Sequence, residues 1–278
     1  MIGFIGIGNM GGAIARAVCK SVDPKSVYVS NHNREKAESF RSLGCCPCPN
    51  EQIAKNCKFI FLGVKPQAME AAVREIAPAL SARDDHFVLV TMAAAIECRK
   101  IQDWVGGAYP VIRIMPNMPV SVGKGVVQYC SLDTCDGDCE EFAALLAQAG
   151  IVDAVPESMI DAACALSGSG PAFCFMFIEA LADGAVSCGL PREKALRYAA
   201  QMVEGSARLV LESGAHPGVL KDQICSPAGT TIEGVRALEG SGFRSAAIEA
   251  VKAAYEKSRR MKRGETRKSK GDCDENCD

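Results

Sequence analysis

The chain has little net charge, few histidines and no long uncharged run, and these shortages exclude several classes of function. Its 31 Lys and Arg residues nearly balance 33 Asp and Glu residues, which leaves a formal net charge of −2. No overall positive field therefore favours nucleic acid as a partner. The longest uncharged run, 162–178, contains SGSGP, which breaks a spanning helix, so we expect no membrane segment.

Cysteine is abundant, but its arrangement does not suggest a disulfide framework. The 15 cysteines are scattered and odd in number, and the opening MIGFIGIG lacks the charged region of a signal peptide. We therefore expect reduced thiols and a cytoplasmic protein. No two C-x-x-C motifs are paired, so we predict no metal site, with zinc at one of three clusters as the alternative. The clusters are Cys45, Cys46 and Cys48; Cys135 and Cys139; and Cys273 and Cys277.

The first half of the chain alternates short apolar runs with helical stretches. We predict strands at 2–6, 27–30, 45–48, 58–62, 86–91 and 110–114, and helices at 9–20, 33–43, 66–77 and 96–104. Two further strands, at 125–130 and 150–154, flank a helix at 138–148. This rhythm is typical of right-handed βαβ units and a mainly parallel sheet.

The β-rich runs stop after Pro156, which divides the chain in two. Helical segments separated by glycine and proline breaks continue to about residue 263. We predict an α/β domain over 1–155 and an all-α domain over 156–263. The remaining residues, 264–278, change from basic to acidic and hold almost no apolar side chains. We expect a disordered tail there, with RNA or membrane contact by its basic part as the alternative.

The clearest chemical motif is GFIGIGNMGGAI. Its Gly6, Gly8 and Gly11 match G-x-G-x-x-G between an apolar strand and a helix. The first glycine of this motif permits a tight turn, the second lets a pyrophosphate approach the backbone, and the third lets helix and strand pack closely. We therefore predict that the N-terminal domain is a Rossmann-like dinucleotide-binding domain.

The end of the second predicted strand indicates which dinucleotide is bound. An NAD site usually carries Asp or Glu there for the ribose 2′-hydroxyl. This chain has Ser30, Asn31, His32 and Asn33 instead, followed by Arg34. A guanidinium beside small hydrogen-bonding groups suits a 2′-phosphate, so we predict NADPH, with NADH as a second cofactor. The alternative is that Asn33 and Arg34 only begin a helix.

Two more strand ends are expected at the same edge of the sheet, where open α/β sheets bind ligands. FLGVKPQ, 61–67, places Val64, Lys65 and Pro66 there. The alternative for Lys65 is an ordinary surface lysine without a role in binding. TMAAA, 91–95, places Ala93 and Ala94 after the next strand. Their small side chains leave room for a flat nicotinamide ring.

Segments along nearly the whole chain, as far as Met261, together resemble 1-pyrroline-5-carboxylate reductase. Besides the glycine motif they are FLGVKP, VIRIMPNMPV, LSGSGPAF, ALADGAVSCGLPR, HPGVLKD and SPAGTTIEGVRALEGSGFRSA. The last is the most specific, because glycine motifs occur in many oxidoreductases. The resemblance implies a helical dimerisation domain after the dinucleotide-binding domain. It also implies NAD(P)H-dependent reduction of 1-pyrroline-5-carboxylate to L-proline, the last step of proline biosynthesis, with these two compounds as ligands.

Reduction of a cyclic imine requires a hydride at the C=N carbon and a proton on nitrogen, but no nucleophile or metal. The three histidines, all in predicted loops or turns, and the lack of a triad agree with this chemistry. Solvent or a nearby hydroxyl is the simplest proton source. In LESGAHPG, Glu212 is the only acid near Gly214 and Ala215, so the partner of the imine nitrogen stays open.

The segment ICSPAGTTIEG, 224–234, begins a predicted helix. Thr230 and Glu233 form T-x-x-E, so we predict a capping box with Thr230 as N-cap and Thr231 as the first helical residue. Unpaired N–H groups around Gly229 can bind a carboxylate, and the resemblance implies that Thr231 contacts substrate. We therefore predict Gly229, Thr230 and Thr231 as the substrate site, with Thr231 as the catalytic residue. A self-sufficient cap is the alternative.

Gln223, just before the threonine segment, is a further candidate cofactor contact. It joins the glycine motif, the strand ends and Asn50 in one predicted cofactor site. The members are Ile5, Gly6, Ile7, Gly8, Asn9, Met10, Gly11, Asn31, Arg34, Asn50, Val64, Lys65, Pro66, Ala93, Ala94 and Gln223.

The segment PAFCFMFIEALADGAVSCGL, 171–190, is apolar almost all round. Only Glu179 and Asp183 are charged, and helices of this kind are buried on every side. A helical domain of this size buries such a helix best against a second copy, so we predict a homodimer or higher homo-oligomer with isologous packing. A Met- and Phe-rich ligand pocket is the alternative.

Two other functions stay open on the sequence alone. A β-hydroxyacid dehydrogenase also joins a dinucleotide-binding domain to helices, but that class relies on a lysine in its first helical segment, which LSGSGPAF lacks. The chain could also be a non-catalytic NADP-binding scaffold. An assay with substrate separates these from the reductase.

Overall fold

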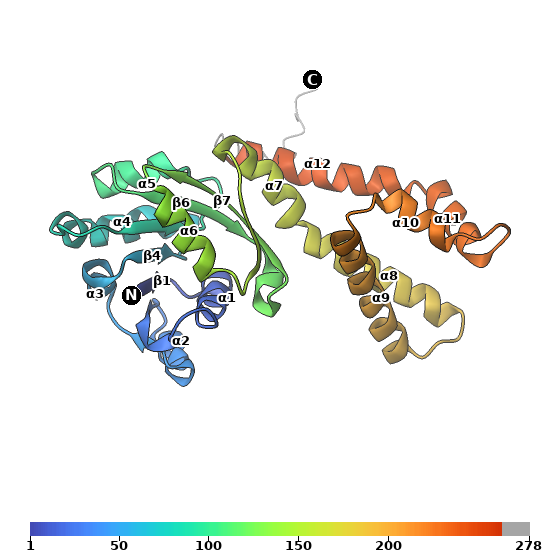
Figure 1. Ribbon diagram of the computed structural model, residues 1–278, viewed down its shortest axis with the longest axis horizontal. Helices are drawn as coiled ribbons and strands as arrows, with labels where there is room; N and C mark the ends of the chain where they lie inside the picture. The colour runs from blue at the N-terminus through green and yellow to red at the C-terminus, as the bar shows by residue number, and fades with distance from the viewer. Residues whose placement is uncertain (263–278) are drawn as a thin grey trace, which may run out of the picture. The chain divides into compact units, whose positions relative to one another are not determined.

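The computed structural model of the chain describes residues 1–262 (Figure 1). The predicted disordered tail at 264–278, with Cys273 and Cys277, lies outside the described residues. The chain divides into two compact units. We call the first the sheet unit, which comprises, among the described residues, Met1–Gly168 and Ala254–Lys262. We call the second, Ser169–Ala253, the helical unit.

The sheet unit contains one eight-stranded sheet of order β3-β2-β1-β4-β5-β6-β7-β8. The strands are β1 Ile2–Ile5, β2 Val27–Ser30, β3 Cys46–Pro47, β4 Phe59–Leu62, β5 Val88–Thr91, β6 Val111–Pro116, β7 Gly125–Leu132 and β8 Gly150–Ala154. Neighbouring strands are parallel except β6 and β7. A short link through the 3-10 helix Met118–Val122 joins that pair, and short links suit antiparallel neighbours. The prediction of a mainly parallel sheet is confirmed.

Helices lie between most of the strands, as predicted. They are α1 Asn9–Val18, α2 Arg34–Ser39, α3 Asn50–Asn56, α4 Pro66–Ser81, α5 Cys98–Val105 and α6 Asp136–Leu145, and α7 Ile160–Ser167 follows the last strand. The sequence prediction missed α3. This helix has 7 residues and buries only Ile53 and Ala54, so its apolar periodicity is too short to detect.

The sheet is covered on both faces, which explains why its strands are almost wholly apolar. Phe59 and Phe61 of β4 belong to one core, together with buried side chains of α1 and α6. The alternate residues Ile60 and Leu62 belong to a second core, with side chains of α3, α4 and α5. Alternate residues of a strand thus point into two different cores. Helix α1, which begins in the glycine motif, packs against the first of them.

The helical unit has fewer buried side chains. Its helices are α8 Gly170–Ser187, α9 Arg192–Ser213, α10 Pro217–Ile224, α11 Thr230–Gly240 and the first part of α12 Phe243–Lys262. Left-handed glycines at 189, 214 and 242 follow α8, α9 and α11, as the predicted breaks require. The buried cluster of this unit consists of Ala182, Ala195 and Ala199.

The division between the units differs in position from the predicted boundary at 155. Helix α7 follows that point but stays with the sheet unit, because Ser167 hydrogen-bonds to Asn117 and Gln128. The distance from Asn117 Nδ2 to the Ser167 carbonyl is 3.0 Å. The chain also returns to the sheet unit at Ala254. Contacts across long stretches of sequence set these limits, and local sequence patterns do not contain them.

One apolar segment bears on the expectation that the chain has no membrane segment. Of the residues described, Glu157–Ser187 is long and apolar enough to cross a membrane, by length and composition only. In the structure SGSGP interrupts this segment with only a two-residue turn between α7 and α8. The helix thus breaks within SGSGP, and the absence of a membrane segment stays an expectation. Exposed helices that pair in an oligomer satisfy the same criterion, so no membrane association follows.

Candidate functional site

The glycine loop after β1 is closely packed at two of its three glycines. Gly6 has a φ of +92°, which favours glycine, and a Cβ added there would lie 2.8 Å from the carbonyl carbon of Gly63. A Cβ on Gly11 would lie 2.2 Å from the Gly6 oxygen. At Gly8, by contrast, no atom lies within 4 Å of an added Cβ. Gly6 and Gly11 are thus required by packing, whereas Gly8 opens onto free space.

Helix α1 begins at this free space with unpaired donors. Gly8 is the N-cap and supplies no side-chain cap, and no acidic residue occupies the first turn. The first N–H groups of the helix, together with its partial positive charge, form a site that fits a pyrophosphate. The residues present therefore fit a dinucleotide.

The predicted strand-end residues lie at one edge of the sheet. Ile5 is in register with Ser30 of β2 and with Leu62 of β4, and Leu62 is in register with Thr91 of β5. Because these strands are parallel, the residues that follow them share the carboxyl edge. The structure thus brings together the predicted cofactor residues after β1, β2, β4 and β5.

Asn31 supports the glycine loop directly. Its Oδ1 accepts a hydrogen bond from the Ile7 N–H at 3.1 Å, and its Nδ2 donates to the Asn33 carbonyl at 3.1 Å. The side chain therefore connects the end of β2 to the loop after β1. This is a positioning contact that the spacing of the motif did not indicate.

The loop after β2 begins helix α2 and leaves Arg34 exposed. Asn33 is the N-cap of α2, where its Oδ1 accepts from the N–H groups of Glu35 and Lys36. Arg34 is exposed, and among residues 1–262 it forms no ion pair. Asn33 thus begins a helix, which was the alternative interpretation of this segment. The guanidinium of Arg34 is available to an anion.

The structure also places the predicted cofactor residues Asn50, Lys65 and Pro66, and the loop at Ala93–Ala94. The Asn50 Nδ2 donates to Oε1 of Glu75 at 3.1 Å. Lys65 is the exposed N-cap residue of α4, and Pro66 occupies its first turn. Ala95 follows the Ala93–Ala94 pair with a φ of +62°, a left-handed conformation uncommon for alanine.

A cleft of about 370 Å³ borders the glycine loop. Arg16 and Lys36 line it, together with Gly8 and Asn9. The guanidinium of Arg16 lies over the ring of Phe40, 4.6 Å from its centroid. The sequence analysis did not single out Arg16, because only the turn of α1 and the packing of Phe40 bring this arginine to the cleft.

The threonine segment of the helical unit departs from the prediction. Gly229, not Thr230, is the N-cap of α11, and no side chain caps the helix. Glu233 pairs instead with Arg236 at 2.9 Å. The predicted capping box is therefore wrong, and Thr230 is the first helical residue.

Backbone geometry explains this correction. Ala228 has a φ of +57°, and a Cβ on Gly229 would lie 2.3 Å from the Ser226 Oγ. A side chain at position 229 would displace the Ser226 hydroxyl, so the turn favours glycine where the helix begins. Because no side chain caps α11, the N–H groups of its first turn are open, and Thr231 is exposed beside them. Gln223 lies on the exposed surface of the preceding helix, α10.

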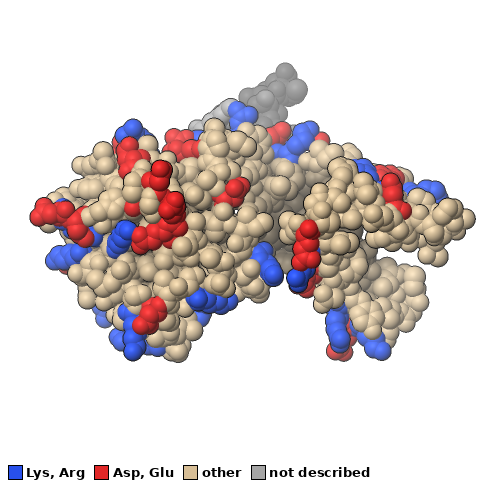
Figure 2. Space-filling model, in the orientation of Figure 1, with Lys and Arg blue, Asp and Glu red and all other residues tan. Residues whose placement is uncertain are grey.

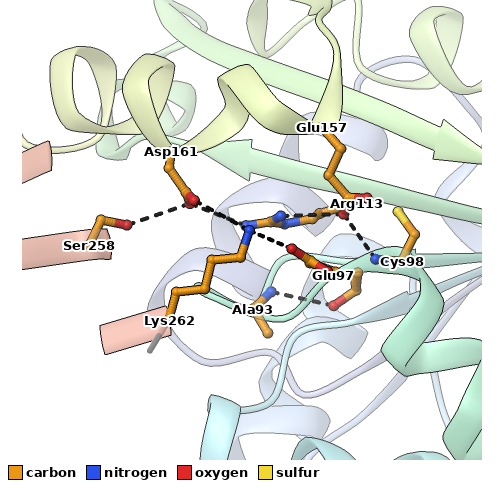
Figure 3. Close-up of polar contacts among 9 residues, drawn as sticks. Ala93, Glu97, Cys98, Arg113, Glu157, Asp161, Ser258 and Lys262 are labelled. Carbon is orange, nitrogen blue, oxygen red and sulfur yellow. Dashed lines mark hydrogen bonds and ion pairs between the residues drawn. The ribbon is translucent and has the colours of Figure 1, made fainter. Parts of the chain in front are cut away.

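A buried arginine organises the part of the sheet unit next to the Ala93–Ala94 loop (Figure 3). Arg113 of β6 is 0% exposed, and its guanidinium contacts Glu157 at 3.3 Å and Asp161 at 3.5 Å. The backbone N–H of Cys98 donates to the same Glu157 carboxylate at 3.0 Å. These contacts join β6, α5 and α7 around one buried charge.

The end of α12 reaches the same cluster. Lys262 pairs with Glu97 and lies 3.9 Å from the Asp161 carboxylate, while Ser258 donates to Asp161 at 3.5 Å. The hydrogen bond from Lys262 holds the pKa of Glu97 below its usual range. Figure 3 shows these side chains converging on Arg113. The sequence analysis missed the cluster because the contacts that Arg113 and Ser258 make with the two carboxylates join residues 44 or more positions apart.

Two groups of side chains could hold a metal ion by distance. They are His86, Cys135 and Asp138, and Cys98, Cys130 and Glu157. In the first, Asp138 already accepts from His86 and from the Cys135 N–H. In the second, Glu157 is already paired with Arg113, whose positive charge opposes a cation. The prediction that the chain has no metal site stays a prediction.

Charge offers no further guide to a partner. On the face shown in Figure 2, side chains of both signs are interspersed over the surface. Mixed charge of this kind matches the net charge of −2 and gives no single-sign field.

Comparisons with known proteins agree on both halves of the chain. Residues 1–94 match the family model "NADP oxidoreductase coenzyme F420-dependent", and residues 157–261 match "Pyrroline-5-carboxylate reductase dimerisation". Pyrroline-5-carboxylate reductase of Arabidopsis thaliana is 42% identical over 268 residues, covering 94% of this chain and 95% of the relative. The enzyme of the same name from Escherichia coli is 40% identical over 266 residues, covering 94% and 97%.

Solved structures give the same result. A pyrroline carboxylate reductase of Plasmodium falciparum with NADP bound has a TM-score of 0.83 at 30% identity, covering 94% of this chain and 97% of that one. A pyrroline-5-carboxylate reductase of Coxiella burnetii has a TM-score of 0.86 at 32% identity, with the same coverage.

Proposed function

The chain belongs to the pyrroline-5-carboxylate reductase family, and from this membership we infer that it reduces 1-pyrroline-5-carboxylate to L-proline with NADPH. The observation that carries the inference is identity of about 40% over 94% of the chain, which includes both units. Neither a β-hydroxyacid dehydrogenase nor a non-catalytic scaffold is favoured by relatives of this similarity. The chain is therefore an oxidoreductase of proline biosynthesis.

We propose that the sheet unit holds the cofactor through the predicted residues. The open N-terminus of α1 binds the pyrophosphate, and Arg34 binds the 2′-phosphate of the ribose. Val64, Lys65, Ala93 and the neighbouring loops border the nicotinamide. NADPH, when bound, supplies a hydride for the C=N carbon of the substrate. NADH is a second, weaker cofactor because it lacks the phosphate.

We propose that the helical unit holds the substrate carboxylate. The first-turn N–H groups of α11, from Gly229 to Thr231, are donors to the carboxylate, and the Thr231 hydroxyl adds another. With its carboxylate bound in this way, the substrate presents the carbon of its C=N group to the hydride of NADPH. A proton then passes to the nitrogen from solvent or from a nearby hydroxyl. Glu212 is occupied by Arg208 at 2.6 Å, so we do not assign it this role.

We propose a homodimer in the cytoplasm as the working form. On α8, Phe175 is 64% exposed and Met176 is 68% exposed in the single chain, although the helix is almost wholly apolar. Large exposed side chains of this kind mark an interaction surface. The family match over 157–261 to a dimerisation model supports a second copy as the partner.

The activity is tested by mixing the purified chain, NADPH and 1-pyrroline-5-carboxylate, and following the near-ultraviolet absorbance of reduced nicotinamide. We expect the absorbance to fall and L-proline to form in equal amount. A parallel reaction with a β-hydroxy acid and NADP should show no change. Binding of NADPH without any turnover of the imine would contradict the proposal and favour a scaffold.

A further inference from the structure

Two thiols of the sheet unit face each other without any part in the proposed reaction. Cys19 follows the last turn of α1, and Cys45 directly precedes β3. Their Sγ atoms are 3.3 Å apart, within hydrogen-bonding distance. A disulfide bond is about 2.05 Å long, so the two sulfur atoms need to approach by only roughly 1.2 Å.

The two thiols differ in their access to solvent. Cys45 is 4% exposed and belongs to the apolar core under α1, whereas Cys19 is partly exposed. Cys19 is therefore the more accessible of the two to a dissolved reagent. An accessible thiol backed by a buried one is the usual arrangement of an attacking and a resolving cysteine.

Their electrostatic surroundings differ in the same direction. The hydrogen bond with Cys45 lowers the pKa of Cys19, and the nearby Arg16 guanidinium adds to this effect, while partial burial opposes it. The same hydrogen bond, together with burial, raises the pKa of Cys45. Cys19 is thus the thiol that ionises more readily, and thiolates are the attacking species in disulfide exchange.

We propose that Cys19 and Cys45 are a site of reversible disulfide formation, with a small disulfide such as oxidised glutathione as the oxidant. The Cys19 thiolate attacks one glutathione sulfur, the S–S bond breaks, and one glutathione leaves as the thiolate. The Cys45 sulfur then loses its proton and attacks Cys19, which releases the second glutathione. The protein loses two electrons and two protons, and oxidised glutathione becomes two reduced molecules.

The bond would enclose the segment 20–44. This segment contains β2 and the loop with Asn31 and Arg34. In the proposed function this loop binds the 2′-phosphate of the ribose. A crosslink restricts the unfolded chain, so we expect the oxidised sheet unit to melt at a higher temperature, by about 5 °C. The proposal itself rests only on the two sulfurs and not on the assigned activity.

Neighbouring thiols provide controls. Cys46 is next to Cys45 but turns away, and its Sγ donates to the Lys25 carbonyl at 3.5 Å. The Sγ atoms of Cys98 and Cys130 also lie within 4.8 Å of each other, but these residues are only 1% and 7% exposed. We expect Cys46→Ser to leave the reaction with oxidised glutathione unchanged, and the Cys98–Cys130 pair to stay reduced.

The test treats the full reduced chain with oxidised glutathione, blocks the remaining thiols with an alkylating agent and maps disulfide-linked peptides by mass spectrometry. We expect a peptide joining Cys19 to Cys45, both in the wild type and in Cys46→Ser. Cys45→Ala should stop at the Cys19 mixed disulfide with glutathione, and Cys19→Ser should form neither product. Dithiothreitol should restore both thiols and the original melting temperature.

Several outcomes would overturn the proposal. A persistent Cys19–glutathione adduct in the wild type would show that Cys45 does not resolve it. A link from Cys19 to Cys46, lost in Cys46→Ser, would show that the wrong neighbour reacts. If Cys45→Ala is unstable, the wild type and Cys46→Ser still decide the matter, since both must give the same linked peptide.

Discussion

The sheet unit and the helical unit are both rich in apolar residues but bury them very differently. The sheet unit has two cores with fully buried phenylalanines such as Phe4, Phe59 and Phe142. The buried cluster of the helical unit consists of three alanines, while Phe175 and Leu211 are 64% and 71% exposed. Buried apolar area is the main source of stability. The sheet unit can therefore stabilise itself, whereas the helical unit needs another apolar surface.

The largest expected effect comes from placing a charge on that exposed surface. Phe175→Asp should abolish the dimer and the activity together, because an interface would bury an unpaired carboxylate. Phe175→Leu, which stays apolar, should keep both. Light scattering gives the mass and the imine assay gives the activity. A monomeric wild type, or an active Asp variant of unchanged mass, would contradict the claim that the helical unit needs a second apolar surface.

Ion pairs sharpen the same comparison. Arg113 in the sheet unit is 0% exposed, so Arg113→Leu leaves two carboxylates without their buried partner and should cost about 3 kcal/mol of unfolding free energy. Arg192 in the helical unit pairs with Asp183, but these side chains are 50% and 60% exposed. Arg192→Leu should cost no more than about 1 kcal/mol. Urea denaturation measures both, and equal losses would contradict the account.

Local patterns in the sequence were enough to predict much of this architecture. The glycine motif between strand and helix, the alternating strands and helices, and the glycine and proline breaks depend on neighbouring residues, and the structure confirms them. The side chains at the carboxyl edge of the sheet could be predicted too, because parallel strands bring their ends together. In each case a short stretch of chain contains the physical cause.

Features that depend on distant contacts could not be predicted. The Arg113 cluster joins residues 44 and 48 positions apart, and Cys19 meets Cys45 across 26 positions. The cap of α11 was wrong for a different reason. The T-x-x-E pattern was present, but the left-handed turn at Ala228 moved the start of the helix to Gly229. A backbone conformation two residues upstream thus outweighed the side-chain pattern.

A smaller effect is expected within the proposed cofactor site. Arg34→Ala should raise the KM for NADPH by about 10- to 100-fold, because a charge-assisted contact of about 1.5–3 kcal/mol is lost. The KM for NADH should change little, since NADH has no 2′-phosphate. Arg41→Ala is the matched control, because Arg41 is a nearby exposed arginine already paired with Glu38. Equal changes for both cofactors would remove Arg34 from the phosphate site.

The central claim is that the sheet unit binds the cofactor and the first turn of α11 binds the substrate, and kinetics of Thr231→Ala test it most directly. Loss of the hydroxyl should remove about 1.5–3 kcal/mol of transition-state stabilisation, a fall of about 10- to 100-fold in kcat/KM for 1-pyrroline-5-carboxylate. The Kd for NADPH and the melting temperature should not change, because no side chain caps α11. Thr231→Ser should recover most of the activity, and Thr230→Ala should have a smaller effect. An unchanged kcat/KM, or a fall matched by weaker NADPH binding, would contradict this division of roles.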